Sequence, residues 1–142
     1  MKTVQQLLHA KSGPLHFVAP EATVYDALAL MARHDIGALV VLDGDRLSGM
    51  FSERDYARKV ILLGRSSRTM PVADVMTPEV VSVTPSSTVE GCMALMTTHR
   101  IRHLPVLEGA RVIGLVSIGD LVKAQIDEQQ FVIEQLENYI AT

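Results

Sequence analysis

Two copies of the pattern Ser-x-x-Asp are the residues of this sequence best suited to binding chemistry. One copy runs from Ser52 to Asp55 and the other from Ser117 to Asp120. At the start of a helix, the hydroxyl and the carboxylate can satisfy backbone amides of the first turn, as in a capping box. The same corner can bind a ligand, because a helix N-terminus attracts phosphate and a carboxylate can accept both hydrogen bonds of a ribose diol. Capping and binding are compatible, and the residue pattern leaves both open.

Different basic side chains accompany the two copies. Arg54, Arg58 and Lys59 surround the first carboxylate, and Arg58 shares its helix face because it lies three residues further on. These cations are either phosphate ligands or a solvated helix surface, and we expect the cluster to bind phosphate. Upstream of the second copy, Arg102 and His103 replace a glycine and an alanine of the first. We expect His103 to contact a ligand rather than to lie at the rim of the site.

These corners belong to an internal duplication. A shift of 65 residues aligns residues 18–55 with residues 83–120 without a gap, and 17 of the 38 pairs are identical. The identical pairs begin at residues 18, 20, 23, 24, 29, 30, 31, 34, 36, 39, 41, 42, 44, 46, 49, 52 and 55. Chance would supply only a few identities, so the chain carries two copies of one structural unit.

Each copy predicts the element order β-α-β-β-α. A short extended segment ends at a proline, and Thr23 or Thr88 then opens a helix. Asp26 three residues after Thr23, and Glu90 three residues after Ser87, predict capping boxes. Two β-rich runs follow, joined at Gly44 in one copy and at Gly109 in the other, where glycine supplies the positive φ of a hairpin turn. A second helix starts at each Ser-x-x-Asp. The predicted fold class is α+β.

Composition excludes several classes of function. The chain has 142 residues, of which 48% are hydrophobic, so it can bury a core and is not disordered. A net charge of −3 argues against nucleic-acid binding. No apolar run approaches the ~18 residues that cross a bilayer, and the N-terminus is too short in apolar residues for a secretory signal. The single cysteine, Cys92, lies in an apolar stretch and reads as a buried thiol. We therefore expect a cytoplasmic protein without nucleic-acid or membrane partners.

The sequence contains no recognisable catalytic or metal-binding motif. The five histidines do not occur in H-x-H or H-E-x-x-H spacing, and Cys92 lies within a predicted helix rather than in an exposed, activated setting. His34 and His99 each end a predicted helix, where an imidazole suits the helix dipole, and we expect them to be structural. We expect neither an enzyme, nor a bound metal, nor a cofactor.

The chain resembles a known family, the tandem cystathionine-β-synthase (CBS) domain pair or Bateman module. The resemblance rests on GMFSERDYARKV and GLVSIGDLVK, on DVMTPEVVSVTPSSTV and on RIRHLPVLEG, and it covers nearly the whole chain. It implies a stand-alone pair of CBS repeats packed about a pseudo-twofold axis. It further implies a regulatory module, usually dimeric, that binds AMP, ADP, ATP, a dinucleotide such as NAD, or S-adenosylmethionine between the repeats, as an energy or metabolite sensor. The alternative is a ligand-free scaffold whose motifs serve only as helix caps.

The resemblance also assigns site residues. In the family the aspartate binds the ribose, the hydroxyl lies on the phosphate side, and adenine occupies an apolar slot. The implied polar contacts are Ser52, Arg54, Asp55, Arg58, Arg102, His103, Ser117 and Asp120. The implied adenine-slot residues, most of which we expect to be core as well, are Val18, Ile36, Ala38, Val83 and Ile101. Thr77 is a weaker candidate near the second site.

The duplication and the tail predict the organisation of the chain. We expect an N-terminal helix and linker over residues 1–16, CBS repeats over 17–64 and 82–124, a linker over 65–81 and a C-terminal helix over 125–142. Apolar residues in and before this helix follow heptad spacing, interrupted by one glutamine, at Val122, Ile126, Gln129, Ile133, Leu136 and Ile140. Such a face either packs on its own domain or meets a second copy, and we expect a homodimer. The protein that a free-standing sensor would regulate is not identified by the sequence.

Overall fold

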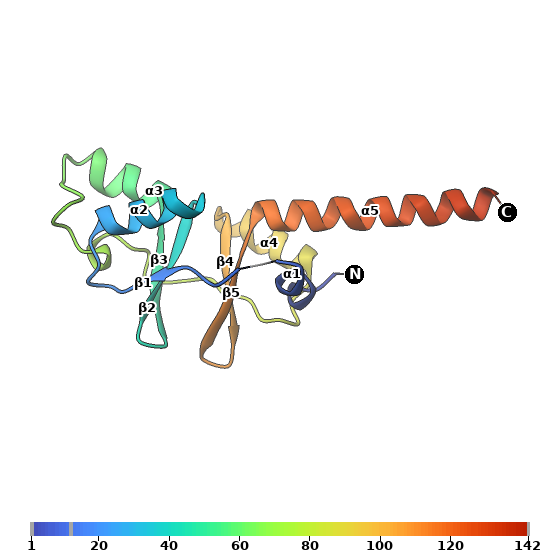
Figure 1. The fold of residues 1–142 in the computed structure, drawn as a ribbon, viewed down its shortest axis with the longest axis horizontal. Helices are drawn as coiled ribbons and strands as arrows, with labels where there is room; N and C mark the ends of the chain where they lie inside the picture. The colour runs from blue at the N-terminus through green and yellow to red at the C-terminus, as the bar shows by residue number, and fades with distance from the viewer. Residues whose placement is uncertain (1, 12, 142) are drawn as a thin grey trace. The chain divides into compact units, whose positions relative to one another are not determined.

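The structure, a computed structural model, describes residues 2–11 and 13–141 (Figure 1). The chain forms two compact units. The repeat-one unit consists of residues 14–80 with the short segment 108–113. The repeat-two unit consists of the N-terminal segment up to Gly13, residues 81–107 and the chain from Gly114 onward. The chain segment that precedes the first repeat therefore packs with the second.

The repeat-one unit is built on a three-stranded sheet in the order β1-β2-β3. β1 (Phe17–Val18) pairs in parallel with β2 (Ala38–Asp43), and β2 pairs antiparallel with β3 (Arg46–Ser52). The other elements of this unit are α2 (Val24–His34), α3 (Glu53–Tyr56), the π-helical turn η1 (Ala57–Ile61) and the 3-10 turn η2 (Val72–Asp74). The predicted β-α-β-β-α order is confirmed here, with a second helix that widens into a π turn.

The second repeat has the same order with a smaller sheet. Its elements are α4 (Val89–His99), β4 (His103–Glu108), β5 (Arg111–Ser117) and α5 (Ile118–Ala141), and the N-terminal helix α1 (Val4–Ala10) packs in the same unit. The predicted first strand is reduced to one parallel bridge between Val83 and Val106. Pro105 explains the loss, because proline has no N–H to donate to the next ladder position. α5 runs without a break across the predicted boundary at residue 124, and the predicted segment boundaries stay predictions.

Local signals position most helix and hairpin ends as predicted. Thr23 and Thr88 are the N-caps of α2 and α4, and their hydroxyls accept the amides of Asp26 and Gly91. The predicted box between Ser87 and Glu90 is wrong. The N-cap is the next residue, Thr88, and Gly91 at its third helical position has no side chain to complete a box. Ser87 instead accepts the amide of Thr84, at 3.1 Å, in the turn before the helix.

The predicted hairpin glycines and helix-ending histidines are also confirmed. Gly44 and Gly109 have φ values of 63° and 64°, as the hairpin turns require. His34 and His99 are the last residues of α2 and α4. Each imidazole therefore lies at the negative end of a helix dipole.

Each repeat has its own buried core. In the repeat-one unit, apolar faces of α2 and of the sheet enclose Phe51, with members Val24, Ala27, Met31, Leu39, Val41, Phe51, Val60, Val72 and Val75. In the repeat-two unit the core comprises Val4, Val83, Val89, Cys92, Met96, Leu104, Val106, Val116, Leu121 and Ala124. Val4 of α1 is completely buried in the second core, so the N-terminal helix is an integral part of that unit.

A glycine in each hairpin lets a distant segment approach the sheet. A Cβ on Gly49 would lie 2.7 Å from the carbonyl oxygen of Thr77, and a Cβ on Gly114 would lie 2.6 Å from Cδ2 of Leu8. At Gly49 a side chain would meet backbone, and at Gly114 it would force the end of the Leu8 side chain to move. The segment at Thr77 therefore pairs with Met50 of β3, and α1 lies against β5. These two contacts position the side chains that reach the Ser-x-x-Asp corners.

Candidate functional site

The first corner, Ser52 to Asp55, forms a complete capping box. The Ser52 amide donates to Oδ2 of Asp55 at 3.0 Å, and the Ser52 hydroxyl donates to the same oxygen at 3.1 Å. In return, the Asp55 amide donates to Oγ of Ser52 at 3.3 Å. The helix-cap interpretation of this motif is therefore confirmed.

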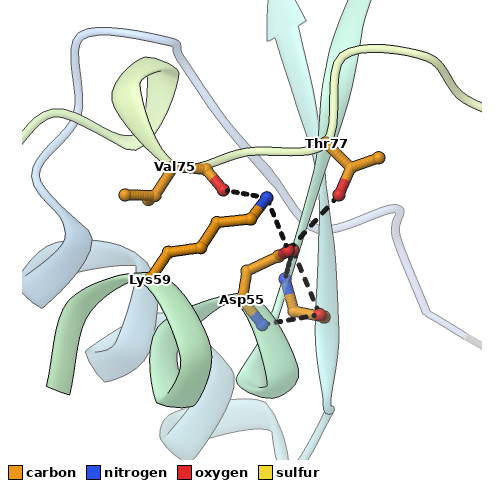
Figure 2. Close-up of polar contacts among 5 residues, drawn as sticks. Asp55, Lys59, Val75 and Thr77 are labelled. Carbon is orange, nitrogen blue, oxygen red and sulfur yellow. Dashed lines mark hydrogen bonds and ion pairs between the residues drawn. The ribbon is translucent and has the colours of Figure 1, made fainter. Parts of the chain in front are cut away.

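The other carboxylate oxygen of Asp55 is occupied as well (Figure 2). The Thr77 hydroxyl donates to Oδ1 at 3.3 Å, and Nζ of Lys59 lies 3.1 Å from the same oxygen. Lys59 also donates to the carbonyl oxygen of Val75 at 3.0 Å. Asp55 is the buried charged residue of the repeat-one unit, with 9% of its surface exposed. Thr77, predicted near the second site, was misplaced: it lies at the first corner because Gly49 admits its strand segment.

The three basic residues predicted around the first corner have different surroundings in the structure. Lys59 lies on the π-helical turn η1 and is engaged by Asp55 and Val75. Arg54 and Arg58 are exposed on the same helical segment. Of the predicted cluster, Lys59 contacts the carboxylate itself. π turns of this kind are rare and frequent at functional positions.

The second corner, Ser117 to Asp120, has the same cap at the start of α5. The Ser117 amide donates to Oδ2 of Asp120 at 2.9 Å, and the Asp120 amide donates to Oγ of Ser117 at 3.1 Å. The cation on this carboxylate is Lys11, whose Nζ lies 2.9 Å from Oδ2 and donates to the carbonyl oxygen of Leu115, also at 2.9 Å. Lys11 was not predicted, because it lies 109 residues from Asp120 and belongs to no motif.

The Asp120 carboxylate retains acceptor capacity that Asp55 has lost. Oδ1 of Asp120 accepts no hydrogen bond from any residue that the structure describes. Its side chain is 29% exposed, compared with 12% for the side chain of Asp55. Burial alone would raise the pKa of Asp120, but hydrogen bonds from Lys11 and Ser117 and the charge of Lys11 outweigh it, so the pKa is lowered. Asp120 therefore presents an ionised carboxylate with one open oxygen.

The predicted pair Arg102 and His103 lies beside this second corner. The Ile118 amide, at the first residue of α5, donates to the carbonyl oxygen of Arg102 at 2.9 Å. Burial lowers the pKa of His103, the charges of Lys11 and Arg102 lower it further, and the charge of Asp120 partly opposes them. The structure thus brings together Lys11, Arg102, His103 and Asp120, of which the sequence predicted all but the lysine.

The predicted adenine-slot residues lie in or against the two cores. Ala38 and Val83 are buried, with 1% and 5% of their surfaces exposed. Val18 and Ile36 pack against the first core, and Ile101 packs against the second. The expectation that these side chains are core is confirmed, and their contact with a base stays a prediction.

The described residues do not form a metal site, an activated cysteine or a membrane-spanning helix. Within residues 2–11 and 13–141, no group of three or more histidine, cysteine or acidic side chains could hold a metal ion. Cys92 is fully buried in α4, and burial raises the pKa of its thiol. No helix among those same residues is long and apolar enough to cross a membrane.

Comparison with known proteins agrees with this architecture. The CBS domain profile matches residues 8–61 and 72–127. A curated relative, the mitochondrial CBS domain-containing protein CBSX3 of Arabidopsis thaliana, is 46% identical, over 97% of this chain and 71% of its own length. A solved structure of a protein with CBS domains from Burkholderia ambifaria MC40-6 is 53% identical, with a TM-score of 0.87 over 90% of this chain and 96% of that one.

More distant structures share the fold. The CBS domain pair of protein MJ0100, solved with 5′-methylthioadenosine and S-adenosyl-L-methionine, has a TM-score of 0.78 at 20% identity, over 90% of this chain and 98% of that one. A hexameric CBS-CP12 protein from bloom-forming cyanobacteria has a TM-score of 0.75 at 29% identity, over 86% of this chain and 70% of that one. CBS domain pairs are regulatory rather than catalytic modules. The duplicated corners, the two matched repeats and the similarity along nearly the full length show that this chain belongs to the CBS domain family.

Proposed function

We propose that this protein is a non-catalytic sensor of adenine nucleotides, AMP, ADP, ATP or NAD, and that the Asp120 corner is its principal binding site. The observation that carries the proposal is the open Oδ1 of Asp120, beside the N-terminus of the 24-residue helix α5. An ionised carboxylate with a free oxygen suits a ribose diol. The first corner offers less, because four donors already occupy both oxygens of Asp55.

The surroundings of Asp120 support a nucleotide rather than a neutral sugar. The helix N-terminus favours negative charge, and Arg102 and Lys11 bring positive charge to the same corner. The ligands of the MJ0100 domain pair, 5′-methylthioadenosine and S-adenosyl-L-methionine, both contain adenosine. That example supports the class of ligand and leaves the number of phosphates to experiment.

Matched aspartate variants test this proposal. Asp120→Asn keeps an oxygen for the Ser117 amide but places an amide where the diol would donate. We expect isothermal titration calorimetry with AMP, ADP, ATP and NAD to show binding by the natural protein and a loss of about tenfold or more in Asp120→Asn. Asp55→Asn is the control and should retain affinity to within about threefold, because its carboxylate has no free acceptor. Equal affinity in the natural protein and Asp120→Asn would contradict the proposal.

We also propose that a second copy of this chain covers the apolar face of α5. Every residue from 129 to 141 is exposed, including Ile133 at 47% and Leu136 at 57%. Ile133 and Leu136 occupy the a and d positions of a heptad. Asp127, Glu128 and Glu134 then fall at b and c positions, away from the seam. Pairing of two copies along the seam therefore does not bring these carboxylates together. The related hexameric CBS-CP12 protein supports assembly in this fold. This face is also what favours the ligand-free scaffold as the second candidate function.

Light scattering tests the homodimer. At micromolar concentration we expect twice the mass of one chain, and one chain for the variant Ile133→Glu, which places a charge in the seam. Glu134→Gln, on the outer side of the same turn, should remain a dimer. A natural protein that scatters as one chain would contradict the dimer.

The predicted cytoplasmic location stays a prediction, and the relative CBSX3 is named as mitochondrial.

A further inference from the structure

Lys11 is held at the Asp120 corner by several independent contacts. It is the C-cap of α1, whose first turn is fixed by the capping box of Thr3 and by the hydrogen bond from the Val4 amide to the Ser87 carbonyl oxygen, at 2.9 Å. Leu8 of the same helix packs against Gly114. The ammonium group is then anchored at 2.9 Å to both Asp120 and the Leu115 carbonyl. This lysine therefore occupies a defined place and is not an extended surface side chain.

The two repeats obtain their lysines from different parts of the chain. Lys59 lies four residues after Asp55 and completes a corner whose carboxylate is almost closed to solvent. The matching position in the second repeat is Ala124, which is buried at 3% exposure. The second repeat thus lacks a lysine at the position of Lys59. Its own Lys123, three residues after Asp120, is exposed on α5, and the lysine that contacts the carboxylate comes from the N-terminal segment. It is also the corner whose carboxylate keeps an open oxygen.

Charge and donor number indicate what Lys11 does there. A carboxylate that accepts a ribose repels a phosphate on the same nucleotide, and a cation beside the carboxylate reduces that repulsion. An ammonium group has three donors, and two of those of Lys11 are used by Asp120 and by the Leu115 carbonyl. One donor remains, and 45% of the side chain is exposed at the surface.

We infer that Lys11 is the specificity-determining residue of the Asp120 corner, where it makes the site select a phosphorylated nucleoside over the neutral nucleoside. The inference rests on the proposed function and adds the residue that reads the phosphate. It also makes the end of α1 part of the binding site, so a charged ligand would contact the N-terminal segment directly. Arg102 lies in the same electrostatic neighbourhood, and the preference is therefore reduced rather than reversed when Lys11 is replaced.

The test compares AMP with adenosine, two probes that differ by one phosphate. Their dissociation constants are measured by calorimetry for the natural protein, Lys11→Met, Lys11→Arg and the matched control Lys59→Met. In Lys11→Met we expect AMP affinity to fall by about tenfold or more while adenosine affinity stays within about threefold. Lys11→Arg should restore most of the preference for AMP, and Lys59→Met should change neither ligand by more than about threefold.

Adenosine binding shows whether a loss of AMP affinity in Lys11→Met results from misfolding. If Lys11→Met binds adenosine as the natural protein does, the corner is intact and a selective loss of AMP belongs to the phosphate. A parallel loss of both ligands, or an unchanged AMP affinity, would overturn the inference while leaving the proposed function in place. If the natural protein binds none of adenosine, AMP, ADP, ATP and NAD, the proposed function fails, and the inference fails with it.

Discussion

The two Ser-x-x-Asp corners share one motif and one capping geometry, but they differ in what else reaches the carboxylate. At the first corner, Thr77 and Lys59 fill Oδ1 of Asp55. At the second, Lys11 joins the cap on Oδ2 of Asp120 and leaves Oδ1 open. The motif is therefore a helix cap in both repeats, and its capacity to bind a ligand depends on side chains supplied from elsewhere in the chain.

Duplication explains why the corners are alike, and the segments that pack on them explain why they differ. The segment at Thr77 lies on β3 and the N-terminal segment lies on β5, each admitted by a glycine of the hairpin. The first segment brings a hydroxyl and the second brings a lysine. The difference teaches that one repeat can become structural while its copy keeps a functional group available.

The largest effect on stability is expected from removing the closed carboxylate. Asp55→Ala loses the cap and leaves Lys59 and Thr77 without their acceptor, so it should lower the free energy of unfolding by about 2–3 kcal/mol. Asp120→Ala removes a more exposed carboxylate and should cost about 1 kcal/mol. Urea denaturation measures both. Equal losses would contradict the assignment of the first corner as the structural one.

The two hairpin glycines provide a smaller test of the same comparison. Gly49→Ala should lower the free energy of unfolding by about 2 kcal/mol, because the new Cβ meets a backbone oxygen that cannot move alone. Gly114→Ala meets the end of the flexible Leu8 side chain and should cost about half as much. Thermal unfolding of the two variants checks the order. A larger cost at Gly114 would show that the N-terminal segment is the more rigid support.

His103, which has no counterpart in the first repeat, should make the free energy of unfolding depend on pH in the acid range. Its pKa is lowered from 6.5, mainly by burial, so the folded protein favours the neutral imidazole. The neutral imidazole therefore contributes to the free energy of unfolding above the unfolded pKa of 6.5. This contribution is lost as the pH falls through the lower pKa of the folded state. The slope from one proton is at most about 1.4 kcal/mol per pH unit. His103→Gln should flatten the curve of unfolding free energy between pH 5 and pH 7.

A residual slope is expected in that variant from the repeat-one unit. Burial and the charge of His34, whose ring stacks on His16 at 3.7 Å, lower the pKa of His16 in the same direction. The double variant His16→Gln and His103→Gln should be flatter than either single variant. No change of slope in His103→Gln would contradict the burial of its imidazole.

The smallest effect is expected from Arg58, one of the two first-corner arginines that the sequence placed in the site. Arg58 is exposed on η1, and we expect Arg58→Gln to leave AMP affinity within about threefold. Arg102→Gln, at the second corner, should weaken AMP by more than Arg58→Gln does. Calorimetry gives both values. A greater loss in Arg58→Gln would return the binding site to the first corner.

Features that depend on neighbouring residues were predictable from the sequence. The duplicated element order, the caps at Thr23 and Thr88 and the hairpin glycines Gly44 and Gly109 follow from local chemistry and periodicity. The capping geometry of both Ser-x-x-Asp motifs is likewise local. Pro105 could have indicated the reduced sheet of the second repeat, because its missing N–H is visible in the sequence.

Features that depend on long-range packing were not predictable. Lys11 reaches Asp120 across 109 residues, and no spacing rule connects them. Thr77 was placed near the wrong corner, because the sequence does not say on which hairpin a linker packs. The alignment offers one signal, the replacement of Lys59 by Ala124, which removes the lysine that lies four residues after the carboxylate. Lys123, three residues after Asp120, suggested a local cation instead.

The stoichiometry of AMP binding tests the central claim most directly. Titration of the natural protein by calorimetry should give one AMP per chain, and the same titration of Asp120→Asn should show that this one site is lost. Two equivalent AMP molecules per chain, or one site that survives Asp120→Asn and disappears in Asp55→Asn, would contradict the assignment of ligand binding to the second corner.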